Sequence, residues 1–270
     1  MAVVQELFIY PLKSGRGIAQ SMVRLGPMGF EWDRQWMAVD ALGTFISQRT
    51  HPRLAQVEPT IAGDSLTLTA RDLAPLQLPL ASGGEPVTVR IWSDHCAGLD
   101  QGDEAAEWIS AAVGDVLRLV RKAPLLDRLA DPQFVGSHPT PVSFTDGYPI
   151  LVCNRASLAD LNTRMPVPIP MERFRPNMVL TGLTAFEEDR IEALQIGPIT
   201  LTLVKPCTRC IITSTDQHSG ERSTNPLPVL RQFRFNRELL GVAFGENAMA
   251  SAGVGSSLAR GAECVTLARA

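Results

Sequence analysis

Proline and glycine are distributed along the whole chain and divide it into short segments. Of its 270 residues, 20 are proline and 21 are glycine. Both residue types interrupt regular structure and favour turns, so long helices are not expected over most of the chain. The short runs between them, such as residues 64–69 and 87–92, alternate apolar and polar side chains in the pattern of half-buried strands. We therefore predict that residues 1–95 fold almost entirely as β-structure.

Two segments break this pattern and predict helices. Residues 103–113 begin with two acidic residues, which favour the positive end of a helix dipole, and Gly114 offers a stop. Residues 157–165 carry apolar side chains at helical spacing, and Ser157 with Asp160 resembles a capping box. The chain is therefore predicted to be mainly β with some α, in the α+β class.

The C-terminal part returns to short strand-like runs. These are residues 178–180, 199–204, 211–213 and 264–267. Ahead of them, residues 123–141 are rich in proline, aspartate and small residues, and we interpret this segment as a long connection. It separates a β-rich N-terminal part from an α+β C-terminal part.

Charge and cysteine content limit the class of protein. Lys and Arg total 25 against 28 Asp and Glu, which gives a net charge of −3. This charge argues against electrostatic binding of nucleic acid by the protein surface as a whole. No run approaches the ~18 apolar residues of a transmembrane helix, and the N-terminus lacks the basic region of a signal peptide. Five cysteines, an odd number, favour reduced thiols over a disulfide framework. We expect a soluble cytoplasmic protein with no nucleic-acid partner and no membrane partner.

Motifs of several common enzyme classes are absent. The sequence contains no P-loop, no Gly-x-Ser-x-Gly nucleophile elbow and no His-Glu-x-x-His zinc motif. The histidines lack the spacing of metal ligands, and we interpret each as a structural or surface residue. They are His51, His95, His138 and His218.

One short motif stands out between two strand-like runs, Lys205-Pro-Cys207-Thr-Arg209-Cys210. In a first interpretation, both thiols are small buried residues, as free cysteine often is. In a second, they form a zinc or disulfide site. A structural zinc needs four ligands and the sequence has no second such pair, while a thioredoxin-type motif would open a helix where residues 211–213 predict a strand. In a third, Cys210 is a single thiolate that holds a redox metal, with Arg209 favouring its charged form.

Around this motif the sequence resembles the MOSC domains, the molybdenum-cofactor sulfurase C-terminal family, and the resemblance extends over nearly the whole chain. In the C-terminal part it is carried by Pro206-Cys-Thr-Arg-Cys210, Phe174-Arg-Pro-Asn177 and Phe144-Thr-Asp146-Gly147-Tyr-Pro149. In the N-terminal part, Tyr10-Pro-Leu-Lys13-Ser14 and Asp33-Arg34-Gln-Trp36-Met37 are similar to the MOSC N-terminal β-barrel domain. Within the family, the chain resembles the amidoxime-reducing components of mitochondria and their bacterial counterparts.

The resemblance implies a fold and an activity. The fold would be an N-terminal β-barrel-like domain over residues 1–122 and a MOSC β-barrel domain with flanking helices over residues 123–270. The activity would be a two-electron reduction of the N–O bond in amidoximes, hydroxylamines and N-hydroxylated bases. A molybdenum cofactor, held as molybdopterin together with one protein cysteine that matches Cys210, would lie in the cleft between the domains.

The resemblance also implies which residues surround the cofactor. By their positions in the motifs, these are Lys13, Ser14, Arg34, Asp146, Gly147, Arg175, Asn177, Thr208 and Arg209. Arginine and lysine suit a phosphate, and aspartate, asparagine and backbone groups suit the hydrogen-bonding edge of a pterin. The catalytic residues would be Cys210, as the metal ligand, and Asp146, as a proton relay. Cys207 would be a neighbour that does not bind the metal.

Departures from the family narrow the expected cofactors and partners. Some bacterial relatives carry a ferredoxin-like domain with cluster-binding cysteines, and this sequence has no such set, so we expect no intrinsic Fe–S cluster. The aminotransferase-like domain of the fused sulfurases is also missing, so pyridoxal phosphate is not expected. An external electron donor of the ferredoxin, flavin or cytochrome type is therefore implied. Two alternatives stay open: a non-catalytic carrier of the cofactor or its sulfur, and a thiol–disulfide or zinc-binding protein that uses Cys207 and Cys210.

Overall fold

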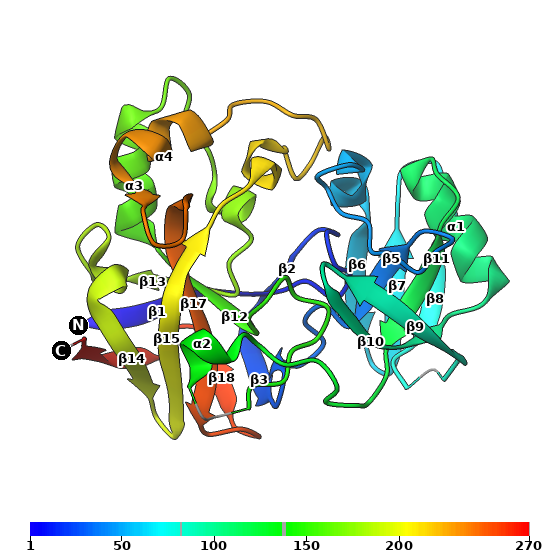
Figure 1. The fold of residues 1–270 in the computed structure, drawn as a ribbon, viewed down its shortest axis with the longest axis horizontal. Coiled ribbons are helices and arrows are strands. Elements are labelled where there is room, and N and C mark those ends of the chain that lie inside the picture. The colour runs from blue at the N-terminus through cyan, green and yellow to red at the C-terminus, as the bar shows by residue number, and fades with distance from the viewer. Residues whose placement is uncertain (82, 137–138, 270) are drawn as a thin grey trace.

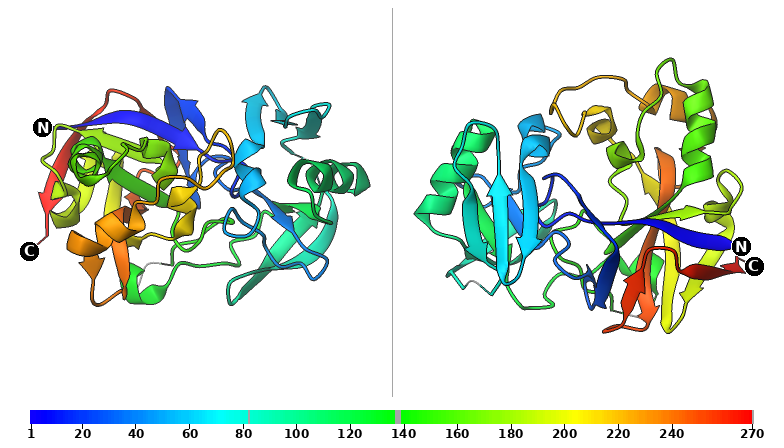
Figure 2. Two further views of the ribbon diagram at one scale, coloured as in Figure 1. Left: turned by 90° about the horizontal axis from the view of Figure 1, so that it is seen from above. Right: turned by 180° about the vertical axis from the view of Figure 1, so that it is seen from behind.

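The computed structural model describes residues 1–81, 83–136 and 139–269. Strands dominate in these residues and are arranged in two parts that lie side by side, as Figures 1 and 2 show. The predicted class, mainly β with some α, is confirmed. The short segments that proline and glycine delimit have become short strands joined by turns.

The larger part is a barrel, which the described residues close with seven strands. Their order around the barrel is β12 (Ile150–Asn154), β13 (Met178–Thr181), β1 (Ala2–Ile9), β19 (Glu263–Ala268), β14 (Ile191–Ile196), β15 (Ile199–Thr208) and β17 (Gly241–Ala252). The barrel closes because β17 also pairs with β12, where Val152 lies opposite Glu246. Two short strands extend this sheet, β2 (Ile18–Gln20) beside β1 and β16 (Phe235–Asn236) beside β17.

Alternate side chains of the barrel strands point inward and fill its core. Leu7 of β1, Val152 of β12 and Leu201 of β15 are almost fully buried in one apolar cluster. This is the packing expected of a small barrel, whose interior is filled by side chains. The interior of the barrel is therefore filled, and a pocket for a ligand has to lie outside it.

The smaller part is built from separate sheets around a second apolar core. Its four-stranded sheet has the order β5 (Trp36–Val39), β11 (Arg118–Lys122), β10 (Asp94–Asp100) and β9 (Glu85–Ile91). A three-stranded sheet consists of β6 (Glu58–Ala62), β7 (Ser65–Thr69) and β8 (Leu76–Pro79). Trp36, Leu66 and Ile109 are buried together in this core. A third small sheet, next to the barrel, joins β18 (Ser257–Ala259), β3 (Met22–Gly26) and β4 (Gly29–Phe30).

The helices are short and lie on the outside of the two parts (Figure 1). The α-helices are α1 (Asp103–Val113), α2 (Pro132–Val135), α3 (Arg155–Arg164) and α4 (Leu227–Phe233). Single 3₁₀ turns are η1 (Pro52–Gln56), η2 (Met171–Phe174), η3 (Glu187–Arg190) and η4 (Ile211–Ser214). The prediction for residues 103–113 is confirmed, and Gly114 ends α1 in the left-handed conformation.

The helix predicted at 157–165 exists, but its predicted capping box is wrong. Helix α3 begins at Arg155, and the side chain of Asn154 caps it by accepting from the Ala156 amide at 3.1 Å. Ser157 lies inside the helix, and its hydroxyl donates to the buried carboxylate of Glu188 at 2.7 Å. The helix therefore starts at the end of β12, where an asparagine is already available as a cap.

The strand predicted at 211–213 is also wrong, because these residues form the 3₁₀ turn η4. The Thr213 hydroxyl donates to the Cys210 carbonyl at 2.9 Å, and the Ser214 hydroxyl donates to the Ile211 carbonyl at 2.7 Å. Such local hydroxyl bonds give the backbone an alternative to a sheet, and here they outweigh the β-propensity of two isoleucines. The strand predicted at 199–204 is instead longer, since β15 continues to Thr208.

The predicted connection at 123–141 contains only the short helix α2 in its described part. The division of the chain at residue 122 stays a prediction. Pairing across that division is extensive, because β1 lies antiparallel to β13, with Val3 opposite Thr181. The first residues of the chain are thus hydrogen-bonded into the C-terminal barrel, and the chain then runs into the smaller part (Figure 2).

Candidate functional site

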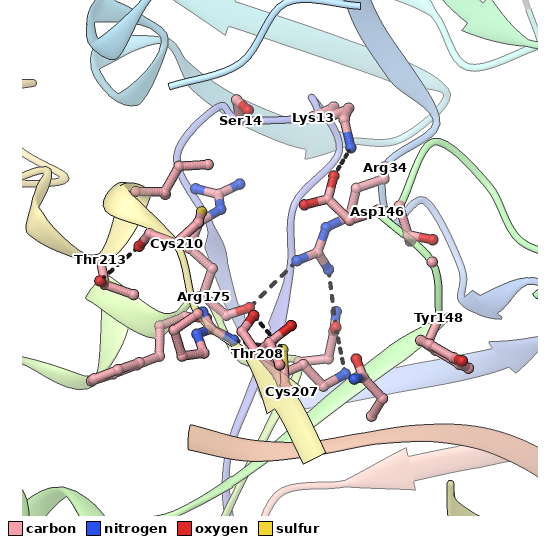
Figure 3. Close-up of a pocket in the computed structure, with 18 of the residues that line it drawn as sticks. Lys13, Ser14, Arg34, Asp146, Tyr148, Arg175, Cys207, Thr208, Cys210 and Thr213 are labelled. Atoms are coloured by element: carbon pink, nitrogen blue, oxygen red, sulfur yellow. Dashed lines mark hydrogen bonds and ion pairs between the residues drawn. The ribbon is translucent and has the colours of Figure 1, made fainter. Parts of the chain in front are cut away.

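A polar pocket lies where the two parts meet, and Figure 3 shows its lining side chains. Its volume is about 300 Å³. All of the residues predicted for the site line it, namely Lys13, Ser14, Arg34, Asp146, Gly147, Arg175, Asn177, Thr208, Arg209 and Cys210. They come from separate segments of the sequence, so the fold brings together what the motifs indicated one by one.

The pocket also contains residues that were not predicted for the site. Among them are Arg49, Thr145, Tyr148, Leu151, Phe174, Lys205, Ile212, Thr213 and Asn247. Cys207, expected to be a neighbour that does not bind the metal, is also part of the lining. Tyr148 directly follows the predicted Gly147, and Lys205 begins the motif that contains Thr208, Arg209 and Cys210, so position in the motifs was a usable signal. Arg49 belongs to no quoted motif, and nothing in its sequence context distinguished it.

Lys13 enters the pocket from the turn that follows β1. Ser14, next to it, has a φ of 67°, an unusual conformation for a residue other than glycine. The buried Lys13 ammonium donates to the Phe144 carbonyl at 2.8 Å and to Asp146 Oδ1 at 2.6 Å. Burial lowers the pKa of Lys13 to about 8, although the charge of Asp146 opposes this shift. Lys13 can therefore release a proton close to neutral pH.

Asp146 is shared by two cations from the N-terminal half of the chain. Its other oxygen, Oδ2, accepts from Arg49 Nη2 at 3.0 Å. The charges of Lys13 and Arg49 hold the pKa of this half-exposed carboxylate well below its ordinary value. The Asp146 carboxylate is therefore ionised throughout the neutral range.

Arg34 is fixed by a polar network on the pocket floor. Its Nη1 donates to Asp33 Oδ2 at 2.6 Å and to Asn177 Oδ1 at 2.9 Å. Asp33 also accepts from Asn177 Nδ2 at 3.0 Å and from the Tyr10 amide at 2.9 Å. Burial raises the pKa of Asp33, while its hydrogen bonds and the Arg34 charge oppose that change. The network holds Arg34 and Asn177 in one orientation.

Arg175 lies beside Arg34, and each guanidinium is 4.3 Å from the centre of the Tyr10 ring. Arg175 has a φ of 55°, and its Nη1 donates to the Gly15 carbonyl at 2.6 Å. Within the described residues, its buried Nη2 has no hydrogen-bond partner. Burial lowers the pKa of Arg175 to about 10. A buried cation without a carboxylate contact is costly unless an anion joins it, so this floor suits an anionic group.

The end of β15 brings the two cysteines of the motif to the pocket. Arg209 Nη1 donates to Cys207 Sγ at 2.9 Å and its Nη2 to the Phe174 carbonyl at 2.6 Å, while its charge also interacts with Cys210 as expected. Arg49 is a second cation near Cys210: burial would lower the pKa of Arg49, but the charges of Asp146 and Cys210 raise it. Cys210 is half-buried and immediately precedes η4, so the unexpected turn directs the chain away just after this thiol. A cation thus stands beside each sulfur.

We also searched the described residues for clusters of metal-binding side chains and for membrane-spanning helices. Nowhere in the described ranges do three or more His, Cys, Asp or Glu side chains come together as a metal site. His51 bonds Asp115 at 2.9 Å and His218 lies 3.2 Å from Glu172, while His138 falls outside the described residues. In the part of the chain that the structure describes, no helix combines the length and the apolar character needed to cross a membrane.

The fold and the pocket define a mainly β protein with a thiol and a group of cations at the meeting of a barrel and a second β-rich part. Comparison with known families agrees with the resemblance seen in the sequence. The family described as "MOSC N-terminal beta barrel domain" matches residues 1–116, and the family described as "MOSC domain" matches residues 139–259. The chain belongs to the MOSC-domain family that includes the amidoxime-reducing components.

Two relatives illustrate this similarity. "Mitochondrial amidoxime reducing component 2" of Bos taurus is 34% identical over 244 residues, which cover 87% of this chain and 73% of the relative. "Mitochondrial amidoxime-reducing component 1" of Homo sapiens is 33% identical over 248 residues, covering 87% and 72%. Among solved structures, the solution structure of a protein of Bordetella bronchiseptica has a TM-score of 0.33 at 21% identity, covering 39% of this chain and 92% of that one. That structural similarity is too low to support an inference.

Proposed function

We propose that this protein is a molybdenum-cofactor-dependent reductase of N-hydroxylated compounds, with Cys210 as the protein ligand of the metal. The observation that carries the proposal is the pocket itself, whose lining has two half-buried thiols, Cys207 and Cys210, together with six cationic side chains and one carboxylate. The cations are Lys13, Arg34, Arg49, Arg175, Lys205 and Arg209. The names of the relatives, which are amidoxime-reducing components, supply the reaction class.

The residues present fit the cofactor. The unpartnered Nη2 of Arg175, on the pocket floor, favours an anionic group there, and a pterin phosphate would supply that charge. Asp146 and the backbone around Gly147 and Thr208 offer donors and acceptors for the pterin edge, and Asn177 contributes by holding Arg34 in place. Ser14, Arg34 and Arg209 complete the predicted binding residues. When bound, the molybdenum supplies the two-electron redox chemistry that reduction of an N–O bond requires.

The protons of the reaction are assigned to Lys13 and Asp146. Reduction of an amidoxime to an amidine consumes two electrons and two protons and releases water. Because Asp146 is held ionised, its role as a relay is to accept and pass on a proton rather than to store one. The group that stores the proton is Lys13, because its pKa of about 8 lies near neutral pH and its Nζ lies 2.6 Å from Asp146 Oδ1.

The electrons come from a separate protein in this proposal, a donor of the ferredoxin, flavin or cytochrome type. The substrate is a small N-hydroxylated molecule that enters from the open side of the pocket. A cytoplasmic location and the absence of an Fe–S cluster and of pyridoxal phosphate stay predictions.

The test is metal analysis with a matched variant. The protein is purified from a host that makes molybdenum cofactor, and molybdenum is measured by mass spectrometry in the wild type and in Cys210→Ala. We expect near-stoichiometric molybdenum in the wild type, its loss in the variant, and reduction of benzamidoxime with a chemical electron donor by the wild type alone. Bound molybdenum without reduction of benzamidoxime would identify the protein as a non-catalytic carrier of the cofactor. Zinc, or a reversible disulfide without molybdenum, would overturn the proposal.

A further inference from the structure

Lys205 is a pocket-lining cation that begins the motif ending at Cys210 but has no role among the proposed cofactor contacts. It lies on β15 opposite Asn247 of β17, and both side chains line the pocket. The neighbouring side chain Tyr148 lies across the pocket from Cys210, with Arg34 between them in the view of Figure 3. The Lys205 corner is therefore separate from the thiol, although both belong to one cavity.

The other cations of the pocket have partners within the protein. Arg34 is paired with Asp33 at 2.6 Å, and Lys13 and Arg49 share Asp146. Arg175 donates to the Gly15 carbonyl at 2.6 Å, and Arg209 donates to Cys207 Sγ and to the Phe174 carbonyl. The unpartnered Nη2 of Arg175 is the position proposed above for the cofactor phosphate. Across the described ranges, no carboxylate lies within ion-pair distance of Lys205.

The surroundings of Lys205 hold its ammonium in place without neutralising it. Its Nζ lies 4.2 Å from the centre of the Phe134 ring and 5.3 Å from that of Tyr148. Aromatic faces attract a cation and fix its position, but they leave its full charge available to a ligand. The Tyr148 hydroxyl in the same wall has no hydrogen-bond partner among the described side chains and backbone groups.

Two further donors stand near this ammonium. The Asn247 amide makes only a long bond, with Nδ2 3.5 Å from the Pro206 carbonyl. Burial raises the pKa of Tyr148, so its hydroxyl keeps its proton and can only donate to an anion. This corner offers an ammonium, a hydroxyl and an amide, with no carboxylate within ion-pair distance of the ammonium in the described residues. The charge of Asp131 reaches Tyr148 but does not pair with Lys205, so the corner matches a carboxylate group of a ligand.

We infer that Lys205, with Tyr148 and Asn247, forms a subsite for a carboxylate of the substrate. The preferred substrates are then N-hydroxylated compounds that carry a negative group at a distance from the N–O bond. The inference rests on the proposed reductase function, because it assigns the second anion-binding corner to the substrate and the floor to the cofactor. Lys205 acts here as a specificity residue and takes no part in the N–O bond cleavage.

The experiment compares two substrates that differ only in charge, 4-carboxybenzamidoxime and its neutral isostere 4-carbamoylbenzamidoxime. Reduction of both is measured with the molybdenum-loaded wild type, Lys205→Gln, Lys205→Arg and Tyr148→Phe. Arg71→Gln is the matched control, since it removes the same unit of charge from a side chain that is 88% exposed and outside the pocket. Molybdenum content is measured in every sample.

We expect Lys205→Gln to lower kcat/KM for the carboxylate by about tenfold or more, as loss of a close charge partner does, and to change the carbamoyl compound less than twofold. Lys205→Arg should retain most of the preference for the carboxylate substrate over the carbamoyl substrate, and Arg71→Gln should retain all of this preference. Equal effects on both substrates would overturn the inference. So would loss of molybdenum in Lys205→Gln, because that result would assign Lys205 to the cofactor.

Calorimetry separates failure of this inference from failure of the proposed function. If the wild type reduces neither compound, the reductase proposal fails, and binding of the two compounds to the purified protein is then measured directly. Tighter binding of the carboxylate that disappears in Lys205→Gln would support the subsite. Equal binding of both compounds by the wild type would overturn it.

Discussion

Arg49 Nη2 lies 3.0 Å from Asp146 Oδ2, and the same guanidinium lies close enough to Cys210 for the two charges to interact. Arg49 comes from the smaller part of the molecule, whereas Asp146 and Cys210 come from the C-terminal half of the chain. Its guanidinium is also 4.6 Å from the centre of the Trp92 ring, which restricts its position. One arginine thus connects the residue proposed as a proton relay with the residue proposed as the metal ligand.

Replacement of Arg49 should therefore impair the site more than the fold. Asp146 is 53% exposed, so the ion pair contributes little to stability. We expect Arg49→Gln to lower kcat for benzamidoxime about tenfold or more, because Asp146 loses a hydrogen-bond donor and Cys210 loses a nearby positive charge. Arg49→Lys should recover part of this loss, since lysine keeps the charge but not the forked geometry. Steady-state kinetics and a thermal melt of each variant measure the two effects.

Arg90→Gln is a suitable control for Arg49. Arg90 lies in the same part of the molecule, is exposed and donates to Thr44 at 3.0 Å without lining the pocket. We expect it to retain the wild-type rate. An Arg49→Gln variant that is as active as Arg90→Gln would contradict the role given to Arg49.

The two cysteines of the motif should respond differently to replacement. Cys207 Sγ accepts from Arg209 at 2.9 Å, whereas Cys210 immediately precedes the turn η4. We expect Cys207→Ser to keep near-stoichiometric molybdenum, because a hydroxyl still accepts from Arg209. Metal analysis beside Cys210→Ser checks this prediction. If Cys207→Ser lost its molybdenum and Cys210→Ser retained it, Cys207 and not Cys210 would be the metal ligand.

Proton supply from Lys13 gives the reaction a pH dependence. Since burial lowers the pKa of Lys13 to about 8, the ammonium is present below that pH and is lost above it. We expect kcat to fall as pH rises through about 8. Lys13→Arg keeps a positive charge but holds its proton, so it should retain molybdenum and lose about 100-fold in kcat.

A pH–rate profile of both proteins between pH 6 and pH 10 tests this assignment. In the Lys13→Arg variant the fall near pH 8 should disappear, together with most of the rate. A wild-type rate that is flat across pH 8, or a variant with the wild-type profile, would show that the proton comes from another group.

Much of the fold was predictable because its signals are local. Acidic residues at the start of 103–113 and Gly114 at its end determine α1 within one segment. The strand at 211–213 was wrongly predicted because hydroxyl bonds from Thr213 and Ser214 to their own backbone compete with sheet pairing. The pairing of β1 with β13 depends on residues far apart in the chain and could not be found from periodicity.

The candidate site was predictable to the extent that motifs mark it. Each predicted residue lies in or beside a quoted motif, and all of them line the pocket. Arg49 could not be found in this way, because its role depends on contact with Asp146, 97 residues away in the sequence. The sequence also could not show that Arg209 faces Cys207, since the direction of a guanidinium depends on the surrounding fold.

A buried carboxylate in the barrel makes stability depend on pH. Glu246 on β17 is 0% exposed; its Oε2 accepts from Arg269 at 2.9 Å, and its Oε1 has no partner among the described residues. Burial raises the pKa of Glu246 from its ordinary 4.5 to about 8. The Arg269 charge opposes this shift, and the charges of Asp189 and Glu188 add to it. The folded protein therefore binds a proton between pH 4.5 and 8 that the unfolded chain releases.

Stability from this group is consequently full below about pH 4.5 and is lost as pH rises through about 8. Glutamine at position 246 cannot ionise, so we expect the free energy of unfolding of Glu246→Gln to fall less between pH 5 and pH 8 than that of the wild type, by about 1–3 kcal/mol. Urea unfolding of both proteins at pH 5, 6.5 and 8 measures the difference. Because all other titrating groups are shared, they cancel in this comparison. Parallel pH curves for the two proteins would mean that Glu246 is already ionised in the fold and that Arg269 compensates its burial.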